Sequence, residues 1–167
     1  SGVMREVTTT SAKQTQKIAS LLAEELTRAS RPVWDGACVI ALTGDLGTGK
    51  TTFTQGFAQA LGIKENVLSP TFVLMKIYGL RPRIKNKSKR IKNTGQGFRH
   101  LVHIDCYRIT SPKDLLHLGF KELLKDKDAI ILIEWADRIK KILPPDAIWL
   151  KFAHGVKQNE RFIAIGG

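Results

Sequence analysis

The feature that most constrains the fold is the octapeptide at residues 44–51, GDLGTGKT, which matches G-x-x-x-x-G-K-[ST] at every position. Its glycines allow backbone conformations that are closed to other residues, so successive N–H groups can turn toward one phosphate group. In this pattern Lys50 carries positive charge to the β- and γ-phosphates of a nucleotide, and the Thr51 hydroxyl takes one position around Mg²⁺. The octapeptide therefore predicts a Walker A phosphate-binding loop.

The segments on either side of the octapeptide have the patterns of a strand and a helix. Residues 37–42 form an apolar run of strand length, and after Thr51 apolar residues recur with helical spacing until Gly62. A helix that starts at this point adds partial positive charge to a phosphate site. This context favours a nucleotide-binding loop over a glycine-rich turn that matches by chance. The residues expected to contact the nucleotide here are Asp45, Leu46, Gly47, Thr48, Gly49, Lys50, Thr51 and Thr52.

The remaining chain alternates strand-like and helix-like segments. We expect strands at residues 3–9, 73–78, 101–105, 129–135, 147–152 and 161–165, the last two antiparallel, and a helix at 115–125 with a break near Gly119. This alternation predicts an α/β fold of the P-loop NTPase type, in which helices flank a mixed, mainly parallel central sheet. The length of 167 residues suits a single domain spanning residues 1–167.

A first helix is expected after residue 11. Ser11 and Gln14 have the spacing of a capping box. The apolar stripe that would face the core consists of Ile18, Leu21, Leu22, Leu26 and Ala29.

Two acidic residues end predicted strands. Glu134 follows an aliphatic run, which places its carboxylate at the edge of the sheet where ligands bind in open α/β folds. It can hold Mg²⁺ opposite Thr51, although a strand-terminal acid that faces solvent is the simpler alternative. Asp105 ends the strand at 101–105 and is a second candidate, either to orient or deprotonate an attacking water or to form a structural salt bridge.

Three further positions are candidates on weaker grounds. Thr71 follows Pro70 in the loop after the expected Walker helix, where an element that senses the γ-phosphate would lie, although the sequence alone favours an ordinary turn hydroxyl. Trp135 either contacts a partner or closes the edge of the core. The four histidines are scattered, and none has metal-ligand spacing to another histidine or cysteine.

The net charge of +12 is concentrated in one segment. Residues 81–99 carry eight basic and no acidic residues, and without these eight the balance falls to +4. We interpret residues 80–99 as a long basic loop, either an electrostatic arm for a nucleic-acid backbone or a solubilising loop. Cys38 and Cys106 show no pairing pattern and indicate reduced thiols in a cytoplasmic protein, and no apolar run approaches the roughly 20 residues of a membrane span.

With these motifs in order, the chain resembles the TsaE (YjeE) family, P-loop ATPases of bacterial tRNA threonylcarbamoyladenosine biosynthesis. The resemblance covers the chain from about Ser11 to its end. One Walker A loop is common to many families, whereas this ordered set is specific. The motifs that carry it are residues 44–52 (GDLGTGKTT), 69–72 (SPTF), 103–108 (HIDCYR), 118–120 (LGF) and 133–138 (IEWADR).

The resemblance implies roles for individual residues. Thr51 and Glu134 would bind Mg²⁺, Asp105 would be important for ATP hydrolysis, and Thr71 would be a switch residue. Trp135, Ser11 and Arg161 would lie near the nucleotide. The family hydrolyses ATP weakly alone and acts with a TsaB–TsaD complex, in which TsaD transfers threonylcarbamoyl to tRNA.

One feature departs from the family pattern. The link between the strands at 73–78 and 101–105 is normally much shorter, so the resemblance assigns the basic insertion no role. We hypothesise that the eight unopposed charges add affinity for tRNA.

Two other functions fit the same loop. A P-loop small-molecule kinase would need an acceptor pocket and an arginine-rich lid, and a nucleotide-regulated RNA-binding module would use ATP only as a conformational ligand. A GTPase is disfavoured, because residues 86–89 (NKSK) lack the aspartate of the guanine-reading N-K-x-D motif.

Overall fold

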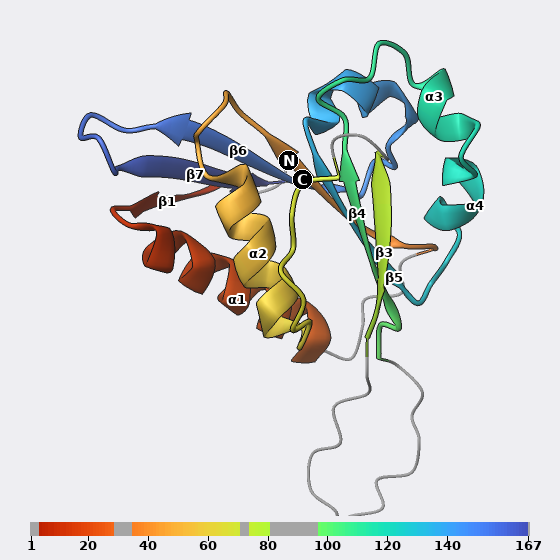
Figure 1. The fold of residues 1–167 in the computed structure, drawn as a ribbon, viewed down its shortest axis with the longest axis horizontal. Coiled ribbons are helices and arrows are strands. Elements are labelled where there is room, and N and C mark those ends of the chain that lie inside the picture. The colour runs from red at the N-terminus through yellow and green to blue at the C-terminus, as the bar shows by residue number, and fades with distance from the viewer. Residues whose placement is uncertain (1–3, 29–34, 71–73, 81–96, 167) are drawn as a thin grey trace, which may run out of the picture.

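The computed structural model describes residues 4–28, 35–70, 74–80 and 97–166. Within these ranges seven strands form one sheet in the order β1-β7-β6-β2-β5-β4-β3 (Figure 1). The strands are β1 Arg5–Thr9, β2 Cys38–Thr43, β3 Met75–Gly79, β4 His100–Asp105, β5 Ala129–Glu134, β6 Ile148–His154 and β7 Arg161–Gly166.

The direction of pairing changes from the centre of the sheet to its edges. Strand β2 pairs in parallel with β5 and β6, and β4 pairs in parallel with β5. The outer pairings, β1 with β7, β6 with β7 and β3 with β4, are antiparallel. The prediction of a mixed sheet is confirmed, and its parallel part brings the carboxyl ends of β2, β4 and β5 to one edge.

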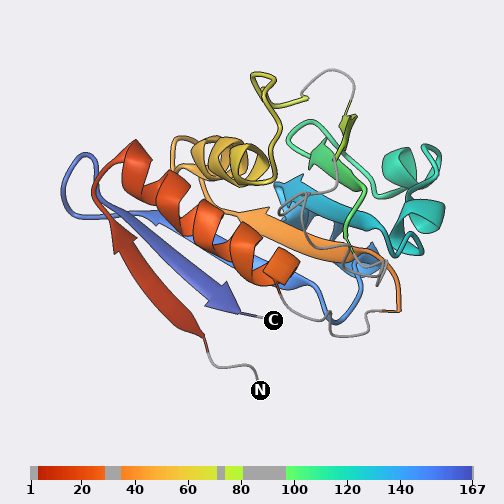
Figure 2. The same ribbon diagram turned by 90° about the horizontal axis from the view of Figure 1, so that it is seen from below.

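Helices cover both faces of the sheet. Helices α1 (Ala12–Arg28) and α2 (Lys50–Ala60) lie side by side on one face (Figure 2). The short helices α3 (Lys113–Leu116) and α4 (Phe120–Leu124) and the 3₁₀ helix η1 (Ala136–Ile142) lie on the other. The break expected near Gly119 is confirmed, since Gly119 separates α3 from α4 with a φ of 81°.

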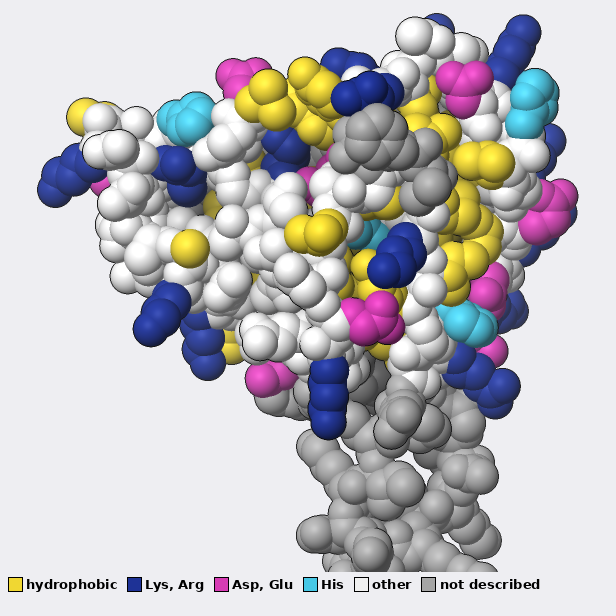
Figure 3. All heavy atoms as spheres, in the orientation of Figure 1, with side chains coloured by type: hydrophobic (Ala, Val, Ile, Leu, Met, Phe, Trp, Pro, Cys, Tyr) yellow, Lys and Arg dark blue, Asp and Glu magenta, His cyan; other side chains and the backbone are white. Residues whose placement is uncertain are grey.

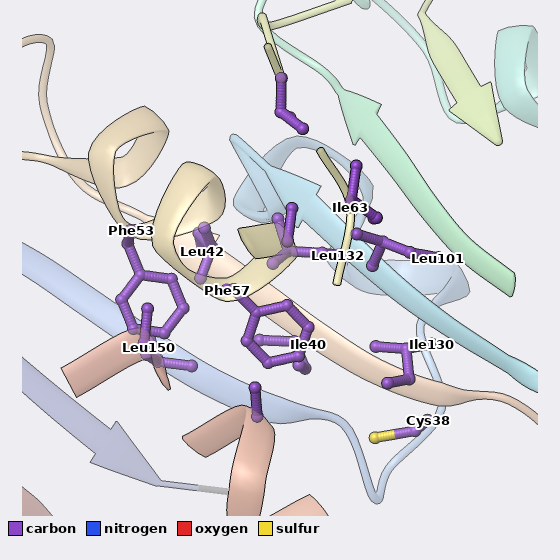
Figure 4. Close-up of a cluster of buried hydrophobic side chains, with 14 of the residues drawn as sticks. Cys38, Ile40, Leu42, Phe53, Phe57, Ile63, Leu101, Ile130, Leu132 and Leu150 are labelled. Carbon is purple, nitrogen blue, oxygen red and sulfur yellow. The ribbon is translucent and has the colours of Figure 1, made fainter. Parts of the chain in front are cut away.

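Alternate residues of each central strand enter two different hydrophobic cores. In β5, Ile130 and Leu132 pack with Phe53 and Phe57 of α2 (Figure 4). Ile131 and Ile133 instead pack with the residues of α3, α4 and η1. A strand has a side-chain period of two, so the next residue on the α2 side of β5 is Glu134.

The core-facing stripe of helix α1 is confirmed at Ile18, Leu22 and Leu26, which pack against the core, and differs from the prediction at one described position. Ala19 and Ala23 are fully buried, whereas Leu21 is 48% exposed and its assignment to the core is wrong. Small residues face the core because α1 and α2 approach closely: a Cβ on Gly56 would lie 2.7 Å from Cα of Gln16. Helical spacing alone does not show that Ala19 and Ala23 lie at the centre of the buried face while Leu21 lies outside it. Ala29 lies outside the described residues.

The basic insertion is shorter than expected at its C-terminal end. Phe98 is 8% exposed and belongs to the core between the sheet and α2. Arg99 forms an ion pair with Asp128, with 3.8 Å from Nε to Oδ2, and its backbone N–H donates to the Asp128 carbonyl. Both residues therefore belong to the fold rather than to a free arm, because burial and pairing secure them. Residues 81–96 lie outside the described part of the chain.

Charged side chains of both signs are interspersed on one face of the described part of the molecule. On the face in Figure 3, the Lys and Arg side chains have Asp and Glu between them and form no continuous basic patch within the described residues. In that same part of the chain, no helix is long and apolar enough to cross a membrane.

Candidate functional site

The octapeptide forms a tight loop between β2 and α2. Gly44, Gly47 and Gly49 have φ values of 137°, 73° and 101°, a region that favours glycine. At Gly44 a Cβ would also lie 2.4 Å from the carbonyl oxygen of Phe152, so that glycine is required there. The loop is closed from within by the Thr48 hydroxyl, which donates to the Asp45 carbonyl at 2.7 Å.

A cavity of about 670 Å³ opens beside this loop at the carboxyl edge of the parallel strands. The structure brings most of the predicted site residues together here. Asp45 and Thr48 belong to the loop without lining the cavity, and Thr71 lies outside the described residues. The predicted residues that line the cavity are Ser11, Leu46, Gly47, Gly49, Lys50, Thr51, Thr52, Asp105, Glu134, Trp135 and Arg161.

Lys50 is a buried cation at the start of α2, with 5% of its surface exposed. Its ammonium group donates to the carbonyl oxygens of Gly44 and Asp45 and lies 4.3 Å from the ring centroid of Trp135. Burial lowers its pKa from 10.5, an effect that nearby acids, Glu134 first among them, partly oppose. An anion at the loop would meet this charge together with the free N–H groups at the N-terminus of α2.

Glu134 faces inward, so the solvent-facing alternative is wrong. Only 2% of the residue is exposed. Its Oε1 accepts a hydrogen bond from the Thr51 hydroxyl at 2.9 Å, and its Oε2 lies 2.6 Å from Nε2 of His103. The carboxylate and the Thr51 hydroxyl are adjacent hard oxygen donors, a set that fits Mg²⁺ when substrate and water supply the other ligands. Within the described residues, no group of three His, Cys, Asp or Glu side chains gathers as a metal site.

Asp105 lies beside Glu134 at the same edge, because the two residues pair directly between β4 and β5. Its carboxylate accepts hydrogen bonds from the Ser69 hydroxyl and from the backbone N–H of Tyr107, the latter at 2.8 Å. These hydrogen bonds hold the Asp105 side chain in place. Within the described part of the chain, Asp105 forms no salt bridge of the kind considered above. The carboxylate remains on the cavity wall, where it can orient a water molecule.

Trp135 lies on the cavity wall in a left-handed conformation, with φ 57° and ψ 40°, which is rare for an aromatic residue. Its ring contacts the Tyr107 ring, with 5.0 Å between centroids, and the Arg138 guanidinium, at 5.3 Å. Arg138 also donates to the Tyr107 carbonyl. This aromatic–guanidinium cluster holds the indole over Lys50, so Trp135 belongs to the site as well as to the edge of the core.

The opposite rim of the cavity comes from the start of α1 and from the β6–β7 hairpin. Arg161 donates from Nε to the Gly47 carbonyl at 3.2 Å, and His154 contacts the Leu46 carbonyl at 3.1 Å. Ser11 Oγ accepts from the Gln14 N–H at 3.2 Å. The reciprocal half of the expected capping box is shifted, because the Gln14 side chain accepts from the N–H of Thr10, at 2.7 Å.

Sequence reasoning did not assign to the site the lining residues Ala12, Thr15, Ser69, Tyr107 and Asn159, or His103 behind the cavity. Asn159 lies in an exposed turn, and nothing in its neighbourhood indicates a role. Ser69 was noted only within the SPTF motif, and its bond to Asp105 spans 36 positions. His103 could have been found: it precedes Asp105 by two residues on one strand, so both side chains point to the same face.

A strand–loop–helix phosphate-loop geometry at the parallel centre of a mixed sheet defines an α/β protein with a P-loop NTPase-like fold. The family model described as "Threonylcarbamoyl adenosine biosynthesis protein TsaE" matches residues 9–163, and the chain belongs to the TsaE family. The role of this family lies in tRNA threonylcarbamoyladenosine biosynthesis.

Individual relatives agree with the family model. The chain is 34% identical over 142 residues to tRNA threonylcarbamoyladenosine biosynthesis protein TsaE of Rickettsia prowazekii, covering 84% of this chain and 81% of the relative. For the protein so named in Bacillus subtilis the identity is 36%, covering 77% and 70%. For that of Haemophilus influenzae it is 34%, covering 65% of this chain and 58% of the relative.

A solved structure agrees in fold as well. The crystal structure of Bacillus subtilis YdiB superimposes with a TM-score of 0.69 and 28% sequence identity. The match covers 100% of this chain and 87% of the YdiB chain.

Proposed function

We propose that this chain binds and hydrolyses ATP, with Mg²⁺, as the ATPase component of tRNA threonylcarbamoyladenosine modification. The observation that carries the proposal is the 2.9 Å contact between Thr51 and Glu134, two residues 83 positions apart, at the end of an intact phosphate loop. A chance glycine-rich turn would not bring a buried carboxylate to this hydroxyl. Family membership supports the pathway, in which the chain would act in the cytoplasm.

The phosphate-binding step follows from the residues of the loop. Among the described residues, the hydrogen bonds of Lys50 go to neutral oxygens, two backbone carbonyls and the Thr48 hydroxyl, and its ammonium group lies over an aromatic face. The charged β- and γ-phosphates of ATP therefore attract it more strongly. The N–H groups at the start of α2 point the same way and add the partial charge of the helix terminus. ATP therefore replaces contacts that the loop makes with itself.

The metal-binding part of the proposal rests on Thr51 and Glu134. These two residues would hold Mg²⁺, which when bound offsets the negative charge on the β- and γ-phosphate oxygens. Before binding, Thr51 keeps the Glu134 carboxylate directed at the loop. Asp105, fixed by Ser69 and the Tyr107 N–H, is positioned to orient the attacking water or to accept its proton.

Weak turnover by the isolated chain fits the arrangement of its arginines. An arginine that reaches the γ-phosphate commonly accelerates such reactions strongly. Arg138 is bonded to the Tyr107 carbonyl, and Arg161 is bonded to the Gly47 carbonyl. We propose that a TsaB–TsaD complex completes or reorders the site.

The test is ATP hydrolysis by the purified chain, with and without TsaB–TsaD, in Mg²⁺ and in EDTA. We expect slow Mg²⁺-dependent release of phosphate that rises when the complex is added, together with formation of threonylcarbamoyladenosine on tRNA. Absence of hydrolysis under all these conditions would overturn the proposal. Phosphorylated product in the presence of nucleosides or sugars would favour the kinase, and RNA binding that responds to ATP without hydrolysis would favour the regulated RNA-binding module.

The basic insertion forms a separate part of the proposal. Its charges between residues 81 and 96 have no acidic neighbour in sequence, which supports contact with the tRNA backbone. Deleting residues 81–96 should weaken tRNA binding by the assembled complex and flatten its salt dependence. Equal affinity and an equal salt slope would remove tRNA contact from the proposal and leave the ATPase activity untouched.

A further inference from the structure

A histidine lies completely buried behind the candidate site. His103 has no exposed surface, and Glu134, its partner, is 2% exposed. The distance of 2.6 Å between His103 Nε2 and Glu134 Oε2 marks a short hydrogen bond. His103 does not line the cavity itself, so any effect it has on a ligand must pass through Glu134.

The sheet topology fixes this contact. In the parallel pairing of β4 with β5, His103 is opposite Leu132, and Asp105 is opposite Glu134. His103 and Glu134 are thus diagonal neighbours on the face covered by α2, within reach of long side chains. Burial in the centre of the sheet leaves both side chains little freedom to rotate away.

The tautomer of the imidazole follows from its surroundings. Among the described residues, Nδ1 of His103 is buried without a hydrogen-bond partner. A buried N–H without a partner costs about 1–3 kcal/mol, so the proton is favoured on Nε2, where it is donated to the carboxylate. Glu134 then receives one hydrogen bond on each oxygen, from His103 on Oε2 and from Thr51 on Oε1.

We propose that His103 is a positioning residue for Glu134: it holds Oε2, so that Oε1 is the oxygen presented at Thr51 for a divalent cation. The inference rests on the proposed function. A cation that takes Oε1 displaces the Thr51 hydrogen bond but leaves the His103 bond intact. The orientation of the carboxylate is therefore maintained before and during metal binding, as in sites whose ligands are fixed by buried outer partners.

A purely structural histidine would behave differently. It would change the free energy of unfolding without changing the dependence of nucleotide binding on Mg²⁺. The measurement is therefore ADP affinity by calorimetry, over a series of free Mg²⁺ concentrations and in EDTA, together with thermal unfolding of each variant.

The decisive variants differ in where they present an N–H group. His103→Gln can place its amide nitrogen near the position of Nε2, whereas the shorter amide of His103→Asn ends near the position of Nδ1. We expect His103→Asn and His103→Leu to weaken the apparent Mg²⁺ affinity about 10- to 100-fold, and His103→Gln to recover most of it. ADP affinity in EDTA should stay unchanged in all three. The matched control is His100→Asn. His100 is the first residue of β4, at the end of the strand away from Asp105, and its Nδ1 lies 3.6 Å from Oδ2 of Asp126.

The outcomes separate this inference from the proposed function. If the wild-type chain binds ADP without any response to Mg²⁺, the proposed function and this inference both fail. If the wild type responds and His103→Asn responds equally, only the positioning role fails. If His103→Leu does not fold, the comparison of the two amide variants still tests the positioning role: His103→Gln should have the higher apparent Mg²⁺ affinity, and equal affinities would contradict it. The double variant His103→Asn/Glu134→Gln should lose no more apparent Mg²⁺ affinity than Glu134→Gln alone, because His103 acts through Glu134. Additive losses would show that His103 acts elsewhere.

Discussion

The two sides of the cavity differ in how their side chains are held. The inner cluster, behind and beside the phosphate loop, is buried except for the half-buried Thr51, and hydrogen bonds link its side chains to one another or to the backbone. The outer rim is exposed or half-buried, and Arg161 contacts the loop through the backbone carbonyl of Gly47. The inner cluster is Lys50, Thr51, His103, Asp105 and Glu134, and the outer rim is Ser11, Asn159 and Arg161.

This difference assigns separate tasks to the two sides. Charges in a buried, preorganised cluster interact strongly because little water screens them, and they need little rearrangement when a substrate charge arrives. Exposed groups on the rim are screened and contribute less. We therefore expect the inner cluster to control chemistry and metal dependence, and the outer rim to adjust nucleotide affinity.

The largest effect is expected for Lys50→Ala in the inner cluster. Removing the buried ammonium should lower ATP turnover on the order of 100-fold or more, because no other Lys or Arg among the described residues is buried at the loop. Steady-state phosphate release measures this loss. Lys17→Ala, an exposed lysine of α1, is the control and should turn over ATP like the wild type.

The thermal stability of Lys50→Ala tests whether its loss of ATP turnover comes from the missing charge or from unfolding. Burial lowers the pKa of Lys50 below 10.5, so its charged form destabilises the folded chain at neutral pH. This cost decreases as the pH rises through the lowered pKa toward 10.5. We expect Lys50→Ala to unfold at the wild-type temperature or slightly higher at pH 7, and a large drop would contradict this account.

The next largest effect is expected for Glu134→Gln. The amide keeps the shape of the side chain but removes its charge, so turnover should fall about tenfold to 100-fold, and the response of ADP binding to Mg²⁺ should disappear. Calorimetry in Mg²⁺ and in EDTA measures this response. Glu122→Gln, on the exposed surface of α4, is the control. An unchanged Mg²⁺ response in Glu134→Gln would exclude this carboxylate as a metal ligand.

The sequence was sufficient for the parts of the site that depend on local pattern. The loop conformation follows from its glycines, and the position of Glu134 follows from an aliphatic strand that ends in an acid. The inward orientation of Glu134 was not predictable, since it depends on the register of β5 against β4 and on the closeness of His103. The period of two along β4 would have placed His103 and Asp105 on one face, but not against a particular partner.

The errors in the fold have a common physical origin. Leu21 was assigned to the core because it fits a helical stripe, yet Ala19 and Ala23 are the fully buried residues of α1 and Leu21 is left exposed. The close approach of α1 to α2, at Gln16 and Gly56, has no signal in that stripe. Phe98 and Arg99 were included in the insertion because of the basic composition around them. The buried ring and the ion pair with Asp128 arise only when distant segments meet. Composition and periodicity are local properties of the sequence, so they do not predict contacts between distant segments.

A smaller effect is expected for Arg161→Ala on the outer rim. The side chain donates one partly exposed hydrogen bond to the Gly47 carbonyl, worth roughly 1 kcal/mol, so ADP affinity should fall about fivefold while its Mg²⁺ response stays intact. Calorimetry measures both quantities. Lys157→Ala, in the same hairpin and away from the cavity, is the control. Loss of the Mg²⁺ response in Arg161→Ala would contradict the division of tasks between the two sides.

The smallest effect concerns thiol reactivity, which tests the contrast in burial directly. Cys106 follows Asp105 and is fully buried, and burial raises its pKa to about 12, so at pH 8 only about one molecule in 10⁴ carries the reactive thiolate. Cys38 is buried as well. We expect the native chain to resist a thiol reagent such as dithionitrobenzoate, whereas Asn159→Cys should react rapidly at its one added thiol and be protected by ADP. Rapid reaction of the native thiols would mean that the sheet behind the inner cluster opens readily, and the preorganisation argued for that cluster would then be wrong.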